Sequence, residues 1–262
     1  MDFKKIKYSV ENHAARIALN SPENLNAFDE IMIDEISEAL KLVEKDDGIK
    51  AVVLAGEGKG FSAGGDIRAM YAALKSQDFE FGAAVKKVGQ LALNIKKLSK
   101  PVIAELHGAV AGAGANIALA CDFCIASEDT RFIEAFVNLG LVPDAGGAYL
   151  LTRAIGVNRA VELMMTGRPV NAGEALQLGI VNKVVPGEKL FEEVQNYVCR
   201  LAAAPSQAIA GMKALVFESE YKGFEKFLEL EESLQKKCGS TEDFREGVFA
   251  FAEKRLPRFT GK

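Results

Sequence analysis

Two short segments near the start of the chain alternate apolar and polar residues. The alternation covers residues 3–10 and 14–20, on either side of the polar stretch ENHA, and it predicts a hairpin of half-buried strands. Helical spacing follows over residues 28–45, where the apolar positions are Ile31, Ile33, Ile36, Leu40 and Val43. This spacing predicts one amphipathic helix that buries those side chains.

The middle of the chain repeats the order strand, loop, helix. The apolar runs at 51–55 and 101–106 predict buried strands, and each leads directly into a glycine-rich loop. Helical patterns recur over 82–98 and 112–120, and a third buried strand is expected at 122–126. This alternation predicts an α/β fold whose functional atoms lie on loops at the ends of strands.

From about residue 188 the pattern predicts helices only. They are expected at 188–203, 206–216, 221–237 and 241–254, with Pro205 and Gly239 as breaks. The tail carries many large apolar residues, namely Phe217, Phe224, Phe227, Leu228, Leu230, Phe244, Phe249 and Phe251. Two interpretations stay open at this point: the tail packs on other subunits, or it packs back on its own core.

Composition and charge narrow the class of protein. The 262 residues suit one large domain or a domain with an appendage, and 32 basic against 36 acidic residues give a net charge of −4. This charge provides no general attraction to nucleic acid or to an anionic membrane. No apolar run reaches the roughly 18 residues of a membrane span, and no secretory signal pattern begins the chain. We therefore expect a cytoplasmic protein.

The four cysteines are too few for a disulfide scaffold. They lie in apolar segments, so we expect buried structural thiols. Cys121 and Cys124 form a CxxC pair, but there is no second pair, and His13 and His107 lie at no zinc-like spacing. The sequence therefore predicts no metal site.

Three glycine-rich segments carry the candidate chemistry: FSAGGDI at 61–67, HGAVAGAGANIALACD at 107–122 and LGLVPDAGG at 139–147. Small residues at a strand end or helix start let a ligand approach main-chain amides. Each loop taken alone also fits a tight turn or close helix packing. The dinucleotide, phosphate-loop and GxSxG patterns are all absent from the sequence, which disfavours nucleotide-binding and triad-hydrolase functions.

Taken together, five motifs in order resemble the crotonase superfamily, the enoyl-CoA hydratase/isomerase family. They are NLNAF at 24–28, FSAGGDI, HGAVAGAGA, PDAGG and REGVFAFAEKR at 245–255, so the resemblance runs along essentially the whole chain. Within the family, the chain is most similar to the 1,2-epoxyphenylacetyl-CoA isomerases of phenylacetate degradation in GAGANIALACD, the pair Ala135-Phe136, LGLVPDAGG, REGVFAFAEKR and the ending RFTGK.

The resemblance implies a crotonase-type spiral of ββα turns over residues 1–200 and a helical trimerisation region over 201–262. It implies a coenzyme A thioester as substrate, with no tightly bound cofactor, and a homotrimer or dimer of trimers. The thioester oxygen would lie in an oxyanion hole made by the amides of Gly65 and Ala113. Implied contacts to coenzyme A are Ala63, Lys59, Asp66, Ile67, Arg68 and Lys254 with its neighbour Arg255, Asp66 serving more to orient its loop.

The sequence departs from the family's hydratases at both positions that usually carry a glutamate. Those positions hold Asn116 and Phe136, and neither side chain can act as a general acid or base. One carboxyl remains at a family catalytic position, Asp144. A single base suffices for moving a double bond, because it can take a proton from one carbon and return it to another. We therefore expect an acyl-CoA isomerase acting on a 3-enoyl-CoA or a ring epoxide, with Asn116 and Phe136 in the substrate pocket.

Alternatives stay open for the function and for individual residues. The protein could instead be a hydratase with unusual residues or a non-catalytic acyl-CoA-binding subunit. Asp144 could cap a helix beginning near Ala145, and Asn116 could hold a water or the substrate, or be simple helix polarity. We expect Glu134 to be exposed or ion-paired rather than in the pocket, and His107 to be structural. Burial would raise the pKa of Asp144, and the pocket walls are expected to include parts of 68–85.

Overall fold

The computed structural model describes residues 3–76 and 82–262, and in this part of the chain the strands form two sheets. The first sheet has the order β1 (Ile6–Glu11), β2 (Ala14–Leu19), β3 (Ala51–Gly56), β5 (Val102–Leu106), β7 (Phe123–Ser127) and β10 (Lys183–Val185). The second has the order β4 (Gly60–Ser62), β6 (Ala109–Ala111), β8 (Arg131–Ile133) and β9 (Val170–Asn171). The predicted β1–β2 hairpin is confirmed, and the first sheet is parallel from β2 onward.

Successive strands alternate between the two sheets, which makes the chain wind as a spiral. β3, β5 and β7 lie in the larger sheet, and the strands that directly follow them, β4, β6 and β8, lie in the smaller one. Each step from the larger sheet to the smaller one passes through a short loop, and each return passes through helices. The glycine-rich segments lie at these loops and at the helix starts after them. The topology therefore stacks functional loops from different turns at one edge of the molecule.

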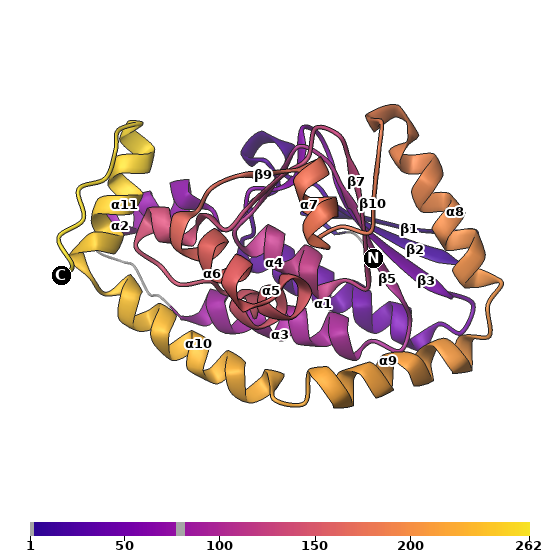
Figure 1. Ribbon diagram of the computed structural model, residues 1–262. Helices are drawn as coiled ribbons and strands as arrows, with labels where there is room; N and C mark the ends of the chain where they lie inside the picture. Colours follow the sequence, from indigo (N-terminus) through magenta and orange to yellow (C-terminus); the bar gives the residue numbers. More distant parts are fainter. Residues whose placement is uncertain (1–2, 77–81) are drawn as a thin grey trace.

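The helices cover both faces of the larger sheet. In chain order they are α1 (Glu30–Lys45), α2 (Ile67–Ser76), α3 (Ala83–Lys97), α4 (Ala113–Ala120), α5 (Gly147–Ile155), α6 (Val157–Thr166), α7 (Ala172–Leu178), α8 (Leu190–Ala202), α9 (Ser206–Glu220), α10 (Phe224–Gly239) and α11 (Glu242–Glu253). Short 3₁₀ helices are η1 (Pro22–Asn24), η2 (Ala135–Leu139) and η3 (Gly187–Lys189). α8 lies against β3, β5 and β7 (Figure 1), on the opposite face from α1 and α3.

The positions of the β3 side chains explain why the sequence of this strand is continuously apolar. Val52 and Leu54 pack in the main core with α1 and α3, whereas Val53 packs in a second cluster with Val194 and Val198 of α8. A strand buried on both faces has no position for a polar side chain. The helix predicted over 28–45 is α1, but Ile31 is 50% exposed, so its predicted burial is wrong and the neighbouring Met32 occupies the core instead.

The four expected tail helices are present, and they pack back on the core. α9 and α10 contact α3, and α11 contacts α2 (Figure 1). Phe224 and Phe244 are fully buried within this single chain, so part of the tail covers its own core, whereas Leu230 and Phe251 of the same set are 55% and 59% exposed. Apolar residues of α9 nevertheless stay exposed: Met212 at 63%, Leu215 at 73% and Val216 at 50%.

The described cysteines are free thiols. Cys121 and Cys124 are buried as predicted, and each donates its Sγ hydrogen to a carbonyl of α4. Cys199 is exposed, so the expectation of burial is wrong there, because it lies on the outer side of α8. Among the described helices, none combines the length and apolar character needed to cross a bilayer.

Candidate active site

Two of the glycine-rich loops come together around Gly64 and Ala113. A Cβ atom placed on Gly64 would lie 3.2 Å from the Ala113 nitrogen and 2.7 Å from the Ala111 oxygen, so the two main chains touch. Gly64 also has φ of +89°, a conformation that glycine adopts without strain. Within the described residues, the amides of Gly65 and Ala113 donate to no backbone or side-chain acceptor. Two free donors therefore lie on adjoining loops, as an oxyanion hole requires.

A cavity of about 500 Å³ opens beside these amides. Of the candidate residues from the sequence, its wall includes Ala63, Gly65, Asp66, Ile67, Ala113, Phe136 and Asp144. The remaining wall is largely apolar and includes Ile33, Met70, Ala73, Val85, Val88, Leu139 and Leu141. Residues 68–85 contribute as expected, but 77–81 lie outside the described residues. An apolar chamber with a few polar groups is typical of a small-molecule site.

The loop that carries Asp144 has an unusual backbone. Ala145 and Gly146 follow it with φ of +53° and +76°, and α5 begins only at Gly147. A Cβ on Gly146 would lie 2.1 Å from the Phe224 ring, so α10 presses directly on this turn. A strained non-glycine residue beside a cavity is a common feature of functional sites.

Asp144 does not cap α5. The N-cap residue is Gly146, and it makes no side-chain capping bond, so the capping interpretation is wrong. The main-chain oxygen of Asp144 is held instead, accepting from Gly147 N at 2.9 Å and from Asn116 Nδ2 at 2.9 Å. Its carboxyl Oδ1 is buried without a hydrogen-bond partner in the described residues. Burial raises the pKa of this carboxyl to about 7, in the direction predicted, which suits a general acid–base group near neutral pH.

The other carboxyls of the cavity wall are already engaged. Asp29 caps α1 through Met32 N at 2.8 Å, and Glu30 pairs with Lys87 at 2.9 Å. Asp66 accepts from Arg68 N and Ala69 N, both at 3.0 Å, which agrees with a role in orienting its loop. Among the described wall residues, Asp144 is thus the carboxyl available for proton transfer.

Asn116 and Glu134 lie just behind Asp144. Asn116 is fully buried and is not part of the cavity wall; its Nδ2 donates to Asp144 as described, while its Oδ1 has no partner. Glu134 is 1% exposed, and neither of its carboxyl oxygens has a hydrogen-bond partner or ion pair in the described part of the chain. The expectation that Glu134 is exposed or ion-paired is therefore wrong. Burial, reinforced by the Asp144 charge, raises the pKa of Glu134 to about 8.

Two residues of α10 join this cluster and were not singled out from the sequence. Glu231 accepts from Gly146 N at 2.8 Å through Oε1, and burial raises its pKa to about 9. Gln235, one turn later, lines the cavity and is 1% exposed. The signal was available: Phe224, Leu228, Glu231 and Gln235 recur at helical spacing, so two polar side chains continue the buried face of α10.

The cationic candidates for coenzyme A binding lie outside the cavity. Lys59, Arg68 and Lys254 are exposed, and within the described residues their side chains form no ion pair. Arg68 is nevertheless flanked by wall residues Ile67 and Ala69. Arg255 already pairs with Glu246 and Glu253, both at 2.6 Å. His107 lies within 3.1 Å of the Gly58 oxygen through Nε2, which fits its expected structural role.

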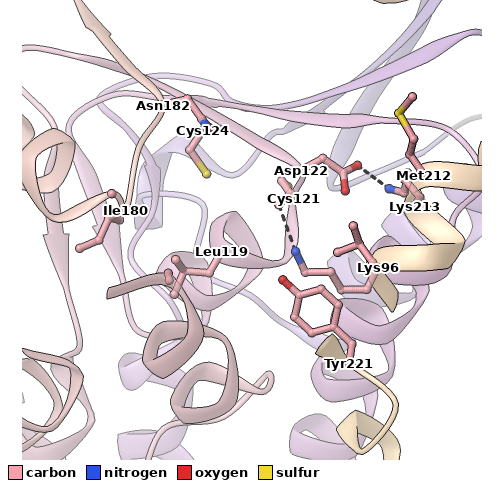
Figure 2. Close-up of a pocket in the computed structure, with 13 residues that line it drawn as sticks. Lys96, Leu119, Cys121, Asp122, Cys124, Ile180, Asn182, Met212, Lys213 and Tyr221 are labelled. Carbon is pink, nitrogen blue, oxygen red and sulfur yellow. Dashed lines mark hydrogen bonds and ion pairs between the residues drawn. The ribbon is translucent and has the colours of Figure 1, made fainter. Parts of the chain in front are cut away.

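A second cavity, of about 360 Å³, lies between α3, α4 and α9 and is shown in Figure 2. Its carboxyl group, Asp122, accepts from Lys213 and from Val102 N at 2.8 Å. Burial raises the pKa values of Cys121 and Cys124, which keeps both thiols neutral. The carboxyl of this cavity is therefore already engaged and its thiols are neutral, and we assign the chemistry to the cavity beside Gly65 and Ala113, where Asp144 has no ion pair.

Known proteins are similar to this chain along essentially its whole length. The sequence model of the enoyl-CoA hydratase/isomerase family matches residues 9–262. The chain belongs to this family. Relatives include a trans-2-decenoyl-[acyl-carrier-protein] isomerase of Streptococcus mutans, 46% identical with 100% of both chains covered. The 1,2-epoxyphenylacetyl-CoA isomerase of Escherichia coli is 38% identical with 97% of both chains covered.

The fold of this enoyl-CoA hydratase/isomerase family member also matches solved structures. A crystal structure of an enoyl-CoA hydratase from Mycobacterium avium subsp. paratuberculosis is 30% identical and superposes with a TM-score of 0.90 over 99% of this chain and 100% of that one. The predicted crotonase fold and family membership are thus confirmed, and the two β-sheets with their alternating strands are the crotonase spiral.

Proposed function

We propose that this protein is an isomerase that moves a carbon–carbon double bond in an enoyl thioester. One observation carries the proposal: among the described carboxyls of the cavity wall, Asp144 alone is free of ion pairs and capping bonds, and it shares the cavity with Gly65 and Ala113. Names of relatives support the same reaction class, since two of them are called isomerases.

The chemistry follows from one base and two amide donors. The Asp144 carboxylate removes a proton from the γ-carbon of a 2-enoyl thioester, or from the α-carbon of a 3-enoyl thioester. The electrons move into a dienolate whose oxygen receives hydrogen bonds from Gly65 N and Ala113 N. The carboxylic acid of Asp144 then returns the proton at the other end of the dienolate, so no atom is gained or lost. Each well-placed amide is worth about 100- to 1000-fold in rate.

Phe136 favours isomerisation over hydration. A hydratase needs a group that activates water, and Phe136 instead contributes a buried apolar ring to the wall. An apolar wall excludes water from the dienolate, which reduces competing addition. The same chemistry extends to a ring epoxide next to the thioester, where enolate formation drives opening of the strained ring.

The carrier of the acyl group has two candidates. Coenzyme A is the carrier expected from the sequence, with Ala63, Asp66 and Ile67 at the wall and Lys59, Arg68 and Lys254 as exposed cations that could reach its phosphates. Acyl carrier protein is the second candidate, because a relative 46% identical to this chain is named for an acyl-carrier-protein substrate. Both carriers present a thioester, so the chemistry at Asp144 is the same.

The test of the proposed function compares products and isotope exchange. We expect the purified protein to interconvert trans-2- and 3-decenoyl thioesters on coenzyme A or acyl carrier protein, with deuterium from heavy water entering the α- and γ-carbons. Crotonyl-CoA and the ring epoxide thioester extend the panel. A hydrate as dominant product would identify a hydratase with unusual residues, and binding without deuterium exchange would identify a non-catalytic acyl-thioester-binding subunit.

We also propose that the protein forms a homotrimer or a dimer of trimers through the helices after residue 200. The exposed apolar side chains Met212, Leu215 and Val216 of α9 support this proposal, because water-exposed apolar patches mark interaction surfaces. α8 runs across residue 200, so the oligomerisation region begins after this helix. We expect light scattering to give three or six times the chain mass, and Leu215→Glu to lower it. A monomeric wild-type protein would contradict the proposal.

Free thiols at all four cysteines support a reducing compartment, and we propose the cytoplasm.

A further inference from the structure

The turn between Asp144 and α5 has a main-chain conformation that its own residues do not favour. Ala145 is completely buried and has φ of +53°, which is unfavourable for a residue with a Cβ atom. Gly146 follows with φ of +76° and, as the N-cap of α5, has no side chain that could cap the helix. A main chain of this kind persists only where its surroundings hold it. The direction in which the Asp144 side chain points therefore depends on the groups packed around the turn.

The first peptide plane of the turn, between residues 144 and 145, is held by hydrogen bonds to its oxygen. The Asp144 main-chain oxygen accepts from Asn116 Nδ2 and from Gly147 N, both at 2.9 Å. The second peptide plane, between residues 145 and 146, takes part in neither bond. Its N–H group belongs to Gly146 and needs an acceptor of its own, because a buried amide without a partner is costly.

Glu231 of α10 supplies that acceptor. Gly146 N donates to Glu231 Oε1 at 2.8 Å, and the Glu231 side chain is shielded from water because the residue is only 4% exposed. The turn has no room for a side chain that could replace this contact, since a Cβ on Gly146 would lie 2.1 Å from the Phe224 ring. The second peptide plane is therefore held from outside the turn, by α10.

We propose that Glu231 is a positioning residue that, through its hydrogen bond to Gly146 N, holds the turn so that the Asp144 carboxyl faces the cavity. This inference rests on the proposed role of Asp144 as the acid–base group. Glu231 is not part of the cavity wall, so it acts through the main chain. Asn116 of α4 and Glu231 of α10 thus fix two successive peptide planes beside the proposed base.

Two substitutions at Glu231 differ chiefly in whether they keep the acceptor. Burial raises the pKa of Glu231 to about 9, so its carboxyl is neutral at pH 7. Glu231→Gln is then a close match in charge and shape, and it keeps an oxygen that accepts from Gly146 N. Glu231→Met has a similar length and a flexible side chain that fills the same space, but its thioether is only a weak acceptor.

Loss of the acceptor is expected to lower turnover more than binding. For Glu231→Met we expect kcat of double-bond isomerisation to fall about 10- to 100-fold with a much smaller change in KM, because a displacement of about 1 Å at a reacting group costs up to about 100-fold. For Glu231→Gln we expect kcat within a few-fold of wild type. A purely structural role would lower the melting temperature of Glu231→Met without changing kcat measured well below that temperature.

Hydrogen exchange gives a second readout that does not depend on turnover. We expect the peptide that spans residues 141–150, followed by mass spectrometry in heavy water, to exchange about 5- to 10-fold faster in Glu231→Met than in wild type, because the Gly146 amide has lost its partner. In Glu231→Gln the same peptide is expected to exchange at about the wild-type rate.

Asn182→Leu is the control matched in the kind of bond that is removed. Asn182 Oδ1 accepts from Cys124 N at 2.7 Å, so this variant also takes a side-chain acceptor away from a main-chain amide. Asn182 lines the second cavity (Figure 2) and is not part of the cavity wall that includes Asp144. We expect Asn182→Leu to have a lower melting temperature and to keep the wild-type kcat.

The inference is overturned if folded Glu231→Met has the wild-type kcat, if Glu231→Gln loses as much activity as Glu231→Met, or if Asn182→Leu loses as much as either. Should Glu231→Met fail to fold, Glu231→Asp decides, because a side chain shorter by one methylene moves the acceptor away from Gly146 N; a wild-type kcat in that variant would contradict the inference. Failure of the proposed function looks different: Asp144→Asn would then keep isomerase activity, while hydrogen exchange at the turn would still separate the Glu231 variants.

Discussion

Replacing Asp144 by asparagine is expected to lower kcat for double-bond isomerisation by about 100- to 10,000-fold, the usual contribution of a general acid–base group. Asparagine has nearly the same shape and leaves the main-chain bonds from Asn116 and Gly147 to residue 144 intact. It cannot take a proton from the substrate. We therefore expect KM to change little and the variant to fold normally, so the loss appears almost entirely in kcat.

Deuterium exchange makes the Asp144→Asn result specific to proton transfer. The variant is expected to bind the enoyl thioester but to introduce no deuterium at the α- or γ-carbon. Asp29→Asn is the control, because Asp29 also lies at the cavity wall but caps α1, and asparagine caps a helix equally well. The control is expected to retain most of the activity. Exchange at the wild-type rate in Asp144→Asn would remove Asp144 from the mechanism.

Gly64→Ala is expected to lower kcat by about 100- to 1000-fold, the value of one oxyanion-hole donor. The new methyl group would lie 2.7 Å from the Ala111 oxygen and 3.2 Å from the Ala113 nitrogen. The two loops must then move apart, and the amides of Gly65 and Ala113 can no longer converge on one oxygen. Alanine at φ of +89° adds roughly 1–2 kcal/mol of strain, so a lower melting temperature is also expected.

Substitution of a second glycine separates the effect of backbone strain from the effect of moving the two loops apart. Gly156 has φ of +81° and no atom within 4 Å of an added Cβ, so Gly156→Ala carries similar backbone strain in open space. We expect this control to lose stability and to keep kcat. Equal kcat values for the two alanine variants, measured well below their melting temperatures, would place the oxyanion hole elsewhere.

The residues of the site that the sequence predicts correctly are those marked by short local motifs. Glycines at strand ends and the order of five motifs led to Gly65, Ala113 and Asp144, and the structure brings these three residues to one cavity. Their roles stay predictions until the variants are measured. Asn116 was expected at the substrate and instead lies behind Asp144, because α4 directs it toward the turn that precedes α5.

The burial of Glu134 was readable from the sequence in retrospect. Phe132, Glu134 and Phe136 recur at every second position, from β8 into the start of η2, and are 1%, 1% and 7% exposed, so the inward face that a period of two predicts for the strand continues past its end. A glutamate between two phenylalanines on that face is a buried carboxyl. Its charge made exposure the natural expectation, since unpaired carboxyls are seldom buried.

The amino-acid sequence by itself determined the elements and the chemical inventory. Periodicity of apolar residues gives the strands and helices, because backbone geometry repeats every two or 3.6 residues. The resemblance to the family adds that Asn116 and Phe136 stand where its hydratases carry glutamates, and that Asp144 stands at a family catalytic position. Only the tertiary structure decided which acids are buried together. Glu134, Asp144 and Glu231 come from three separate parts of the chain, and the pKa of each carboxyl depends on how much water the others and the packed helices displace.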